Sequence, residues 1–130
     1  MINTIRIDNF PYKEESSEII GIGIEIHKEL GAGFAEIVYK DALEYELGKR
    51  QIKLEREKNY CVHYKDTILK HHFFADFVVY DNIILEIKAK EAIAPEDYAQ
   101  TINYLKCSGC ELGLILNFGK SKLEIKRVLF

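Results

Sequence analysis

Residues 75–89 read ADFVVYDNIILEIKA and contain two β-strand patterns separated by a turn. The β-branched and aromatic residues on either side favour strands, and Asp81-Asn82 supplies turn-forming residues between them. The second strand is apolar on both faces, through Ile83, Ile84, Leu85 and Ile87. A strand of that composition is typical of the centre of a sheet. The stretch therefore predicts a hairpin whose second strand is buried.

Charged residues interrupt this buried strand. Glu86 and Lys88 are two positions apart, so they share one face, and Asp76 lies on the preceding strand. A buried charge is costly unless it is paired or binds a metal. Two carboxylates and an ammonium group on one sheet suit a hard divalent cation that activates water. The alternatives are a solvated salt bridge on an edge strand for Glu86 and Lys88, and a loop cap for Asp76.

Three motifs sharpen the interpretation. Asp76 followed by Glu86-Ile87-Lys88 resembles the D…(D/E)xK signature of the PD-(D/E)xK nuclease superfamily. Residues 33–39 match a GxxExxY motif, and residues 100–104 match a QxxxY pattern. In this order and in so short a chain, they resemble the GxxExxY protein family, from about Ser16 to the C-terminus. Ala75 stands where the superfamily name has proline, a departure that many members share.

The resemblance implies an α/β domain with a restriction-endonuclease-like core. The expected sheet is mixed, with about five strands, and is flanked by about three helices. The implied activity is Mg²⁺- or Mn²⁺-dependent hydrolysis of phosphodiester bonds in DNA or RNA. Asp76, Glu86 and Glu36 would be metal ligands, and these three together with Lys88 would be catalytic. Gln100, Tyr39 and Tyr104 would bind substrate or support the catalytic residues.

The residues of the second and third motifs, Glu36, Tyr39, Gln100 and Tyr104, also have simpler interpretations. Glu36 stands at a helix start, where a carboxylate interacts favourably with the helix dipole. Tyr39 shares its face one turn later and either bonds a carboxylate or packs. Gln100 and Tyr104 are one helical turn apart, and Gln100 either positions Lys88 or a phosphate or is simply solvated.

Periodicity and turn residues predict the order of elements as two helices, three strands, a helix and two strands. The expected ranges are helices 14–30, 35–49 and from 95 to about 109, and strands 53–64, 68–79, 83–89, 112–117 and 123–129. Residues 1–12 are expected to form a short extended arm. The inward face of the second helix is expected to carry Val38, Ala42 and Tyr45.

Composition sets limits on function. The 130 residues suit a single domain, residues 1–130, with 48% hydrophobic content. The net charge of −3 counts against tight autonomous binding of nucleic acid and favours a rival hypothesis. That rival is a non-catalytic nucleic-acid-binding or protein-interaction module on the same fold, possibly as a homodimer.

The sequence also indicates the cellular compartment in which we expect the protein. Charged residues occur early, at Arg6 and Asp8, without an apolar run, so we expect no secretory signal. We also expect no membrane span, because no stretch of the sequence is apolar enough. Three cysteines are an odd number and suggest a reducing cytoplasm. Cys107 and Cys110 form a C-x-x-C that falls at an expected helix C-terminus, the wrong end for a thioredoxin-type thiolate.

Hairpin register decides whether the carboxylates meet, because opposed residues of an antiparallel pair share a face. A two-residue loop, Asp81-Asn82, would set Glu86 opposite Phe77 and send Asp76 to the other face. A three-residue loop, 80–82, sets Asp76 opposite Glu86. Asn82 tolerates the left-handed conformation that such loops use at their end. We therefore predict an odd loop or a β-bulge next to Asp76.

Overall fold

The computed structural model describes residues 10–130. Its elements, in chain order, are α2 (Lys13–Leu30), α3 (Glu36–Lys49), β1 (Leu54–Tyr64), β2 (Thr67–Val79), β3 (Ile83–Lys88), α4 (Pro95–Ser108), β4 (Leu112–Asn117) and β5 (Glu124–Leu129). The predicted order of elements is confirmed, with boundaries within about two residues. Most of the expected N-terminal arm, residues 1–9, lies outside the described residues.

The five strands form one mixed sheet in the order β1-β2-β3-β4-β5. β3 and β4 are parallel, and every other neighbouring pair is antiparallel. A parallel pair needs a crossover connection, and α4 supplies it. The predicted restriction-endonuclease-like α/β architecture is thus confirmed, and β3 lies at the centre of the sheet as its apolar composition predicted.

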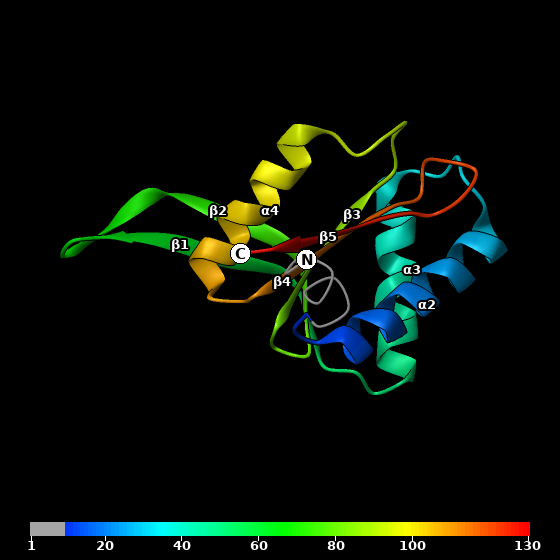
Figure 1. Ribbon diagram of the computed structural model, residues 1–130, viewed down its shortest axis with the longest axis horizontal. Coiled ribbons are helices and arrows are strands. Elements are labelled where there is room, and N and C mark those ends of the chain that lie inside the picture. Colours follow the sequence, from blue (N-terminus) through cyan, green and yellow to red (C-terminus); the bar gives the residue numbers. More distant parts are fainter. Residues whose placement is uncertain (1–9) are drawn as a thin grey trace, which may run out of the picture.

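Two cores lie on opposite faces of the sheet (Figure 1). On one face, α2 and α3 pack against alternate residues of the central strands, among them Phe77, Leu85 and Ile87. On the other face, α4 packs against residues such as Ile84 and Ile115. Successive residues of β3 therefore enter different cores, which is why the strand is apolar on both faces.

The buried face of α3 differs from the predicted one. Tyr39, Leu43 and Leu47 are fully buried, whereas Tyr45 is 64% exposed. Val38 and Ala42 are only half-buried and flank the buried row. The prediction for this face was wrong because the helix alternates apolar residues with small and charged ones, so two stripes are nearly equivalent in sequence.

The β1–β2 hairpin extends beyond both cores as an arm (Figure 1). At its base, Glu57 adopts a positive φ of 54°, which is costly for a residue other than glycine. Arg56 pairs with Phe77 and Lys58 with Ala75, so Glu57 lies opposite Asp76. The irregular backbone in β1 thus falls beside one of the predicted site residues.

The β2–β3 hairpin has the predicted three-residue loop. Val79 pairs with Ile83, Val78 with Ile84 and Phe77 with Leu85, which brings Asp76 opposite Glu86. The left-handed residues are Tyr80 and Asp81, with φ of 58° and 61°, rather than Asn82. Asn82 instead donates its backbone N–H to the Val79 carbonyl and its side-chain amide to the Tyr80 carbonyl. The turn therefore has two left-handed central residues, and Asn82 is the extra residue that sets the register.

Candidate metal and nuclease site

The regular ladder between β2 and β3 stops after Phe77 and Leu85. At the next opposed pair, Asp76 and Glu86, side-chain carboxylates accept hydrogen bonds from backbone N–H groups in place of backbone carbonyls. The Asp76 N–H donates to Glu86 Oε2 at 2.8 Å, and the Ile87 N–H donates to Asp76 Oδ2 at 2.8 Å. Each carboxylate thus satisfies a backbone donor that the separating strands leave free. One oxygen of each residue, Asp76 Oδ1 and Glu86 Oε1, remains for other partners.

Both carboxylates of this pair are buried. Asp76 is 8% exposed and Glu86 is 2% exposed. This rules out the alternative of a solvated salt bridge on an edge strand. Burial raises the pKa of the Glu86 carboxyl to about 8, and the negative charge of Asp76 acts in the same direction. A cation close to both groups would relieve this electrostatic cost.

Lys88 lies on the α4 side of the pair. Its ammonium group is 4.0 Å from Glu86 Oε1 and 3.8 Å from Asp97 Oδ1, and it donates to Gln100 Oε1 at 3.4 Å. Tyr104, one turn after Gln100 on α4, is buried. Burial and the charges of Glu86, Asp76 and Glu57 raise the pKa of Tyr104. The structure therefore brings Gln100 and Tyr104 to the carboxylate pair.

The backbone after Lys88 is held in place from β4. The Phe118 N–H donates to the Lys88 carbonyl at 2.8 Å. The Asn117 side chain both accepts from the Lys90 N–H and donates to the Lys90 carbonyl. Gly119 lies so close that an added Cβ would meet the Lys90 carbonyl oxygen at 2.2 Å. This packing fixes the end of β3 and with it the start of the Lys88 side chain.

Lys40 lies on the α3 side and was missed by the sequence analysis. Its ammonium group is 2.9 Å from Asp76 Oδ1, 3.2 Å from Glu36 Oε2 and 3.6 Å from Glu57 Oε2. Burial lowers the pKa of Lys40, but its hydrogen bonds to and attraction by Asp76 and Glu36 outweigh burial and raise that pKa above its usual value. Lys40 thus joins carboxylates from α3, β1 and β2.

Two sequence signals could have found these residues. Lys40 is four residues after Glu36 on α3 and therefore lies on the same helical face. Glu57 becomes visible once β1 and β2 are aligned, because it is then opposite Asp76. Neither residue belongs to a motif, and pairing between β1 and β2 depends on an arm whose register the sequence does not specify.

The GxxExxY segment has a structural role that its spacing did not predict. Gly33 adopts a φ of 113°, which favours glycine, just before α3. The Tyr39 hydroxyl donates to the Gly31 carbonyl at 2.5 Å and accepts from the Phe34 N–H at 3.2 Å. Its ring stacks on Phe118 with centroids 4.5 Å apart. Tyr39 therefore holds the loop that leads to Glu36, rather than bonding a carboxylate.

The donor chemistry of the central pair fits a hard divalent cation. Asp76 Oδ1 and Glu86 Oε1 are carboxylate oxygens, the ligands that Mg²⁺ and Mn²⁺ prefer. Within residues 10–130, no three acidic, histidine or cysteine side chains already stand in a metal-binding arrangement. Glu36 is separated from the pair by the Lys40 ammonium. The residues that fit a metal here are thus Asp76 and Glu86.

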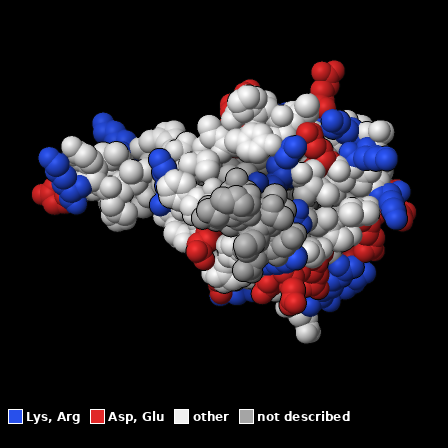
Figure 2. Space-filling model, in the orientation of Figure 1, with Lys and Arg blue, Asp and Glu red and all other residues white. Residues whose placement is uncertain are grey.

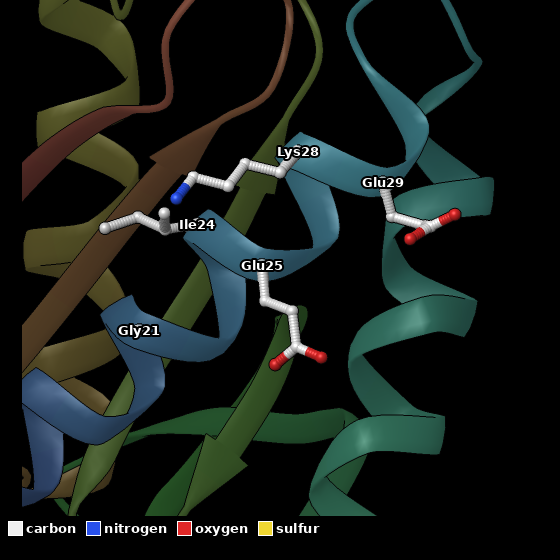
Figure 3. Close-up of a pocket in the computed structure, with 5 residues that line it drawn as sticks. All are labelled: Gly21, Ile24, Glu25, Lys28 and Glu29. Carbon is white, nitrogen blue, oxygen red and sulfur yellow. The ribbon is translucent and has the colours of Figure 1, made fainter.

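Surface hollows lie elsewhere. One of about 330 Å³ runs along α2 and is lined by residues of that helix alone (Figure 3). Lys28 points away from Glu25 and Glu29, so no polar groups converge there (Figure 3). A second hollow, of about 450 Å³, lies between α2 and residues 121–125, which form the loop before β5 and its first residues, and it is mostly apolar. Neither is lined by a residue of the carboxylate pair.

Charge is mixed on the face in Figure 2. Lysine and arginine side chains alternate with acidic ones over the body, and the arm carries charge mainly near its tip, the turn at Lys65 and Asp66 (Figure 2). Among the described residues visible in this view, lysine and arginine form no continuous basic surface of the kind that binds a phosphate backbone (Figure 2). Among the described residues, no helix is long and apolar enough to cross a membrane.

A mixed sheet with helices on both faces, and an Asp-Glu-Lys set where its central strands separate, defines a nuclease-like class of protein. Residues 13–128 match the family model of the PD-(D/E)XK nuclease superfamily. The chain belongs to this superfamily. No curated protein gives a significant match.

A solved structure is similar in fold. The crystal structure of SSO0001 matches with a TM-score of 0.59 and 18% sequence identity. The match covers 91% of this chain, and the chain spans about 60% of the length of the SSO0001 chain. At this identity the likeness concerns the fold alone.

Proposed function

We propose that this protein is a metal-dependent nuclease that hydrolyses phosphodiester bonds in DNA or RNA. The observation that carries the proposal is the buried Asp76–Glu86 pair, in which each carboxylate bonds a backbone N–H of the opposite strand and keeps one oxygen for a cation. We also assign the chain to the GxxExxY branch and to the cytoplasm. Its free thiols, Cys61, Cys107 and Cys110, suit that reducing compartment.

Asp76 Oδ1 and Glu86 Oε1 would hold Mg²⁺ or Mn²⁺. When bound, such a cation polarises a phosphoryl oxygen and lowers the pKa of the attacking water. Lys88 would stabilise the negative charge that develops on the phosphoryl group, since its ammonium is next to Glu86. Gln100 would hold Lys88 in that position, and we place Tyr104, one turn further along α4, in the same support of the site.

The non-catalytic alternative has a specific observation in its favour. The Lys40 ammonium already neutralises Asp76 at 2.9 Å, as it would in a fold that has no need of a metal. The net charge of −3 also disfavours tight binding of nucleic acid by a single chain. In that case the protein would act as a binding module, and dimerisation would enlarge its surface.

A cleavage assay separates the two functions. Labelled single- and double-stranded DNA and RNA are incubated with the protein and Mg²⁺, Mn²⁺ or EDTA. We expect cleavage of at least one substrate, and this cleavage should need the metal and disappear in Asp76→Asn. Binding without cleavage under every condition would favour the module. Equal cleavage by wild type and variant would show that the activity comes from a contaminant or another site.

A further inference from the structure

We propose that Lys40 is the resident cation of this site and competes with the divalent metal for Asp76, so that metal loading displaces its ammonium group. This inference rests on the proposed metal site. It adds a residue that sets the metal affinity, and it gives Glu36 a role as a partner of Lys40.

The competition follows from distances. The Lys40 Nζ lies 2.9 Å from Asp76 Oδ1, the oxygen that is not used by the Ile87 backbone. A magnesium-sized cation binds a carboxylate oxygen at about 2.1 Å. Two positive groups on one oxygen would be only a few ångströms apart in a buried site, where their repulsion is strong. The Lys40 ammonium must therefore leave Asp76 Oδ1 when the divalent cation binds there.

The Lys40 ammonium can move toward two other carboxylates when it leaves Asp76. Its other two partners, Glu36 and Glu57, have side chains 41% and 54% exposed, whereas that of Asp76 is 11% exposed. The flexible four-carbon stem of lysine allows the ammonium to swing outward. After that movement it would still be paired with both glutamates, so metal binding would not leave an unpaired charge in the protein.

Lys88 does not have this relation to the pair. It is 4.0 Å from Glu86 Oε1, and its hydrogen-bond partner is the neutral Gln100. A cation between Asp76 and Glu86 therefore does not require Lys88 to move. The two lysines thus have separate roles, and substituting Lys40 tests the competition without removing the proposed catalytic lysine.

The test is calorimetric titration of Mn²⁺ into wild type, Lys40→Gln and Lys40→Arg, with melting temperatures measured in EDTA and in Mn²⁺. Lys58→Gln is the matched control, because Lys58 lies on β1 beside Glu57 and pairs with Glu55 instead. We expect Lys40→Gln to bind Mn²⁺ at least about fivefold more tightly than wild type. Lys40→Arg and the control should show no such gain. In EDTA, Lys40→Gln should melt lower than wild type, and Mn²⁺ should close that gap by mass action.

The outcomes are distinguishable. If wild type binds Mn²⁺, Asp76→Asn does not, and Lys40→Gln binds no more tightly than wild type, the competition is wrong while the metal site stands. If no variant binds Mn²⁺, the proposed metal site falls and the competition falls with it. Should Lys40→Gln fail to fold, Lys40→Met, which keeps the apolar stem, replaces it in the same comparison.

Discussion

The two sides of the Asp76–Glu86 pair present a lysine each, but in different surroundings. On the α3 side, Lys40 is surrounded by three carboxylates, the nearest at 2.9 Å. On the α4 side, Lys88 has a neutral hydrogen-bond partner and carboxylates only at 3.8 Å and 4.0 Å. A lysine enclosed by carboxylates serves as a counter-ion, whereas one with looser contacts can turn toward a substrate. If the protein is the nuclease proposed above, the catalytic side of the site would therefore face α4.

The largest effect should come from the residues of the α4 side and the pair itself. We expect Lys88→Ala and Asp76→Asn each to lower metal-dependent cleavage by at least about 10³-fold, because each removes a charge that acts on the reacting phosphate or its metal. Rates on a labelled substrate measure this. The control is Lys53→Gln, which changes an exposed lysine paired with Asp81. Loss of activity in the control as well would mean that any lost lysine weakens substrate binding and that Lys88 is not special.

The second effect concerns pH and stability. The pKa of Glu86 rises from 4.5 to about 8 in the folded protein. Between these values the folded state binds more protons than the unfolded state, so the free energy of unfolding should fall as pH rises through this window. Each pKa unit corresponds to about 1.36 kcal/mol. Glu86→Gln cannot ionise, so it should melt several degrees higher than wild type at pH 8.

Melting curves of wild type and Glu86→Gln between pH 4.5 and pH 8.5, in EDTA, test this pH dependence. The two proteins should differ least at the acidic end, where the Glu86 carboxyl is protonated. Melting temperatures that stay parallel across the range would show that Glu86 is ionised in the folded protein without cost.

A smaller effect is expected at Gln100. Its side-chain oxygen accepts a hydrogen bond from Lys88, so Gln100→Ala should leave the Lys88 ammonium less firmly positioned. We expect about a tenfold fall in kcat, since misplacing a catalytic group by about an ångström is enough for such a loss. The control is Glu96→Gln, because Glu96 is an exposed residue of the same helix. A change in KM alone would instead assign Gln100 to substrate binding.

The smallest effect separates the loop role of Tyr39 from a role in catalysis. Tyr39→Phe removes hydrogen bonds to the Gly31 carbonyl and from the Phe34 N–H, at a cost of about 1 kcal/mol. The melting temperature should therefore fall by about 2–5 °C. Cleavage below the melting transition should be nearly unchanged. A loss of activity far beyond the loss of stability would place the hydroxyl in the reaction.

Sequence predicted the fold and the register well because both depend on local patterns. The alternating faces of residues 75–88 and the three-residue loop were sufficient to bring Asp76 opposite Glu86. Prediction from the sequence failed for residues whose role depends on elements that are far apart in the chain. Lys40 and Glu57 gain their importance from the packing of α3 against the β1–β2 sheet, which no motif records. Tyr39 was given a site role by its motif, but its hydroxyl bonds the loop before α3 and its ring stacks on Phe118.

The conformation of the β2–β3 turn was also only partly predictable from the sequence. The loop length was predicted correctly, but the left-handed residues are Tyr80 and Asp81. Asn82 has the higher intrinsic tolerance for that conformation. The hydrogen bonds of the Asn82 backbone and side chain to Val79 and Tyr80 decide the conformation instead.

The most direct test of the central claim is diffraction from crystals grown with Mn²⁺, measured at a wavelength where manganese scatters anomalously. We expect one strong anomalous peak about 2.1 Å from Asp76 Oδ1 and from Glu86 Oε1, with the Lys40 ammonium moved toward Glu36 and Glu57. A site without a peak at saturating Mn²⁺, with Lys40 still 2.9 Å from Asp76, would contradict this expectation.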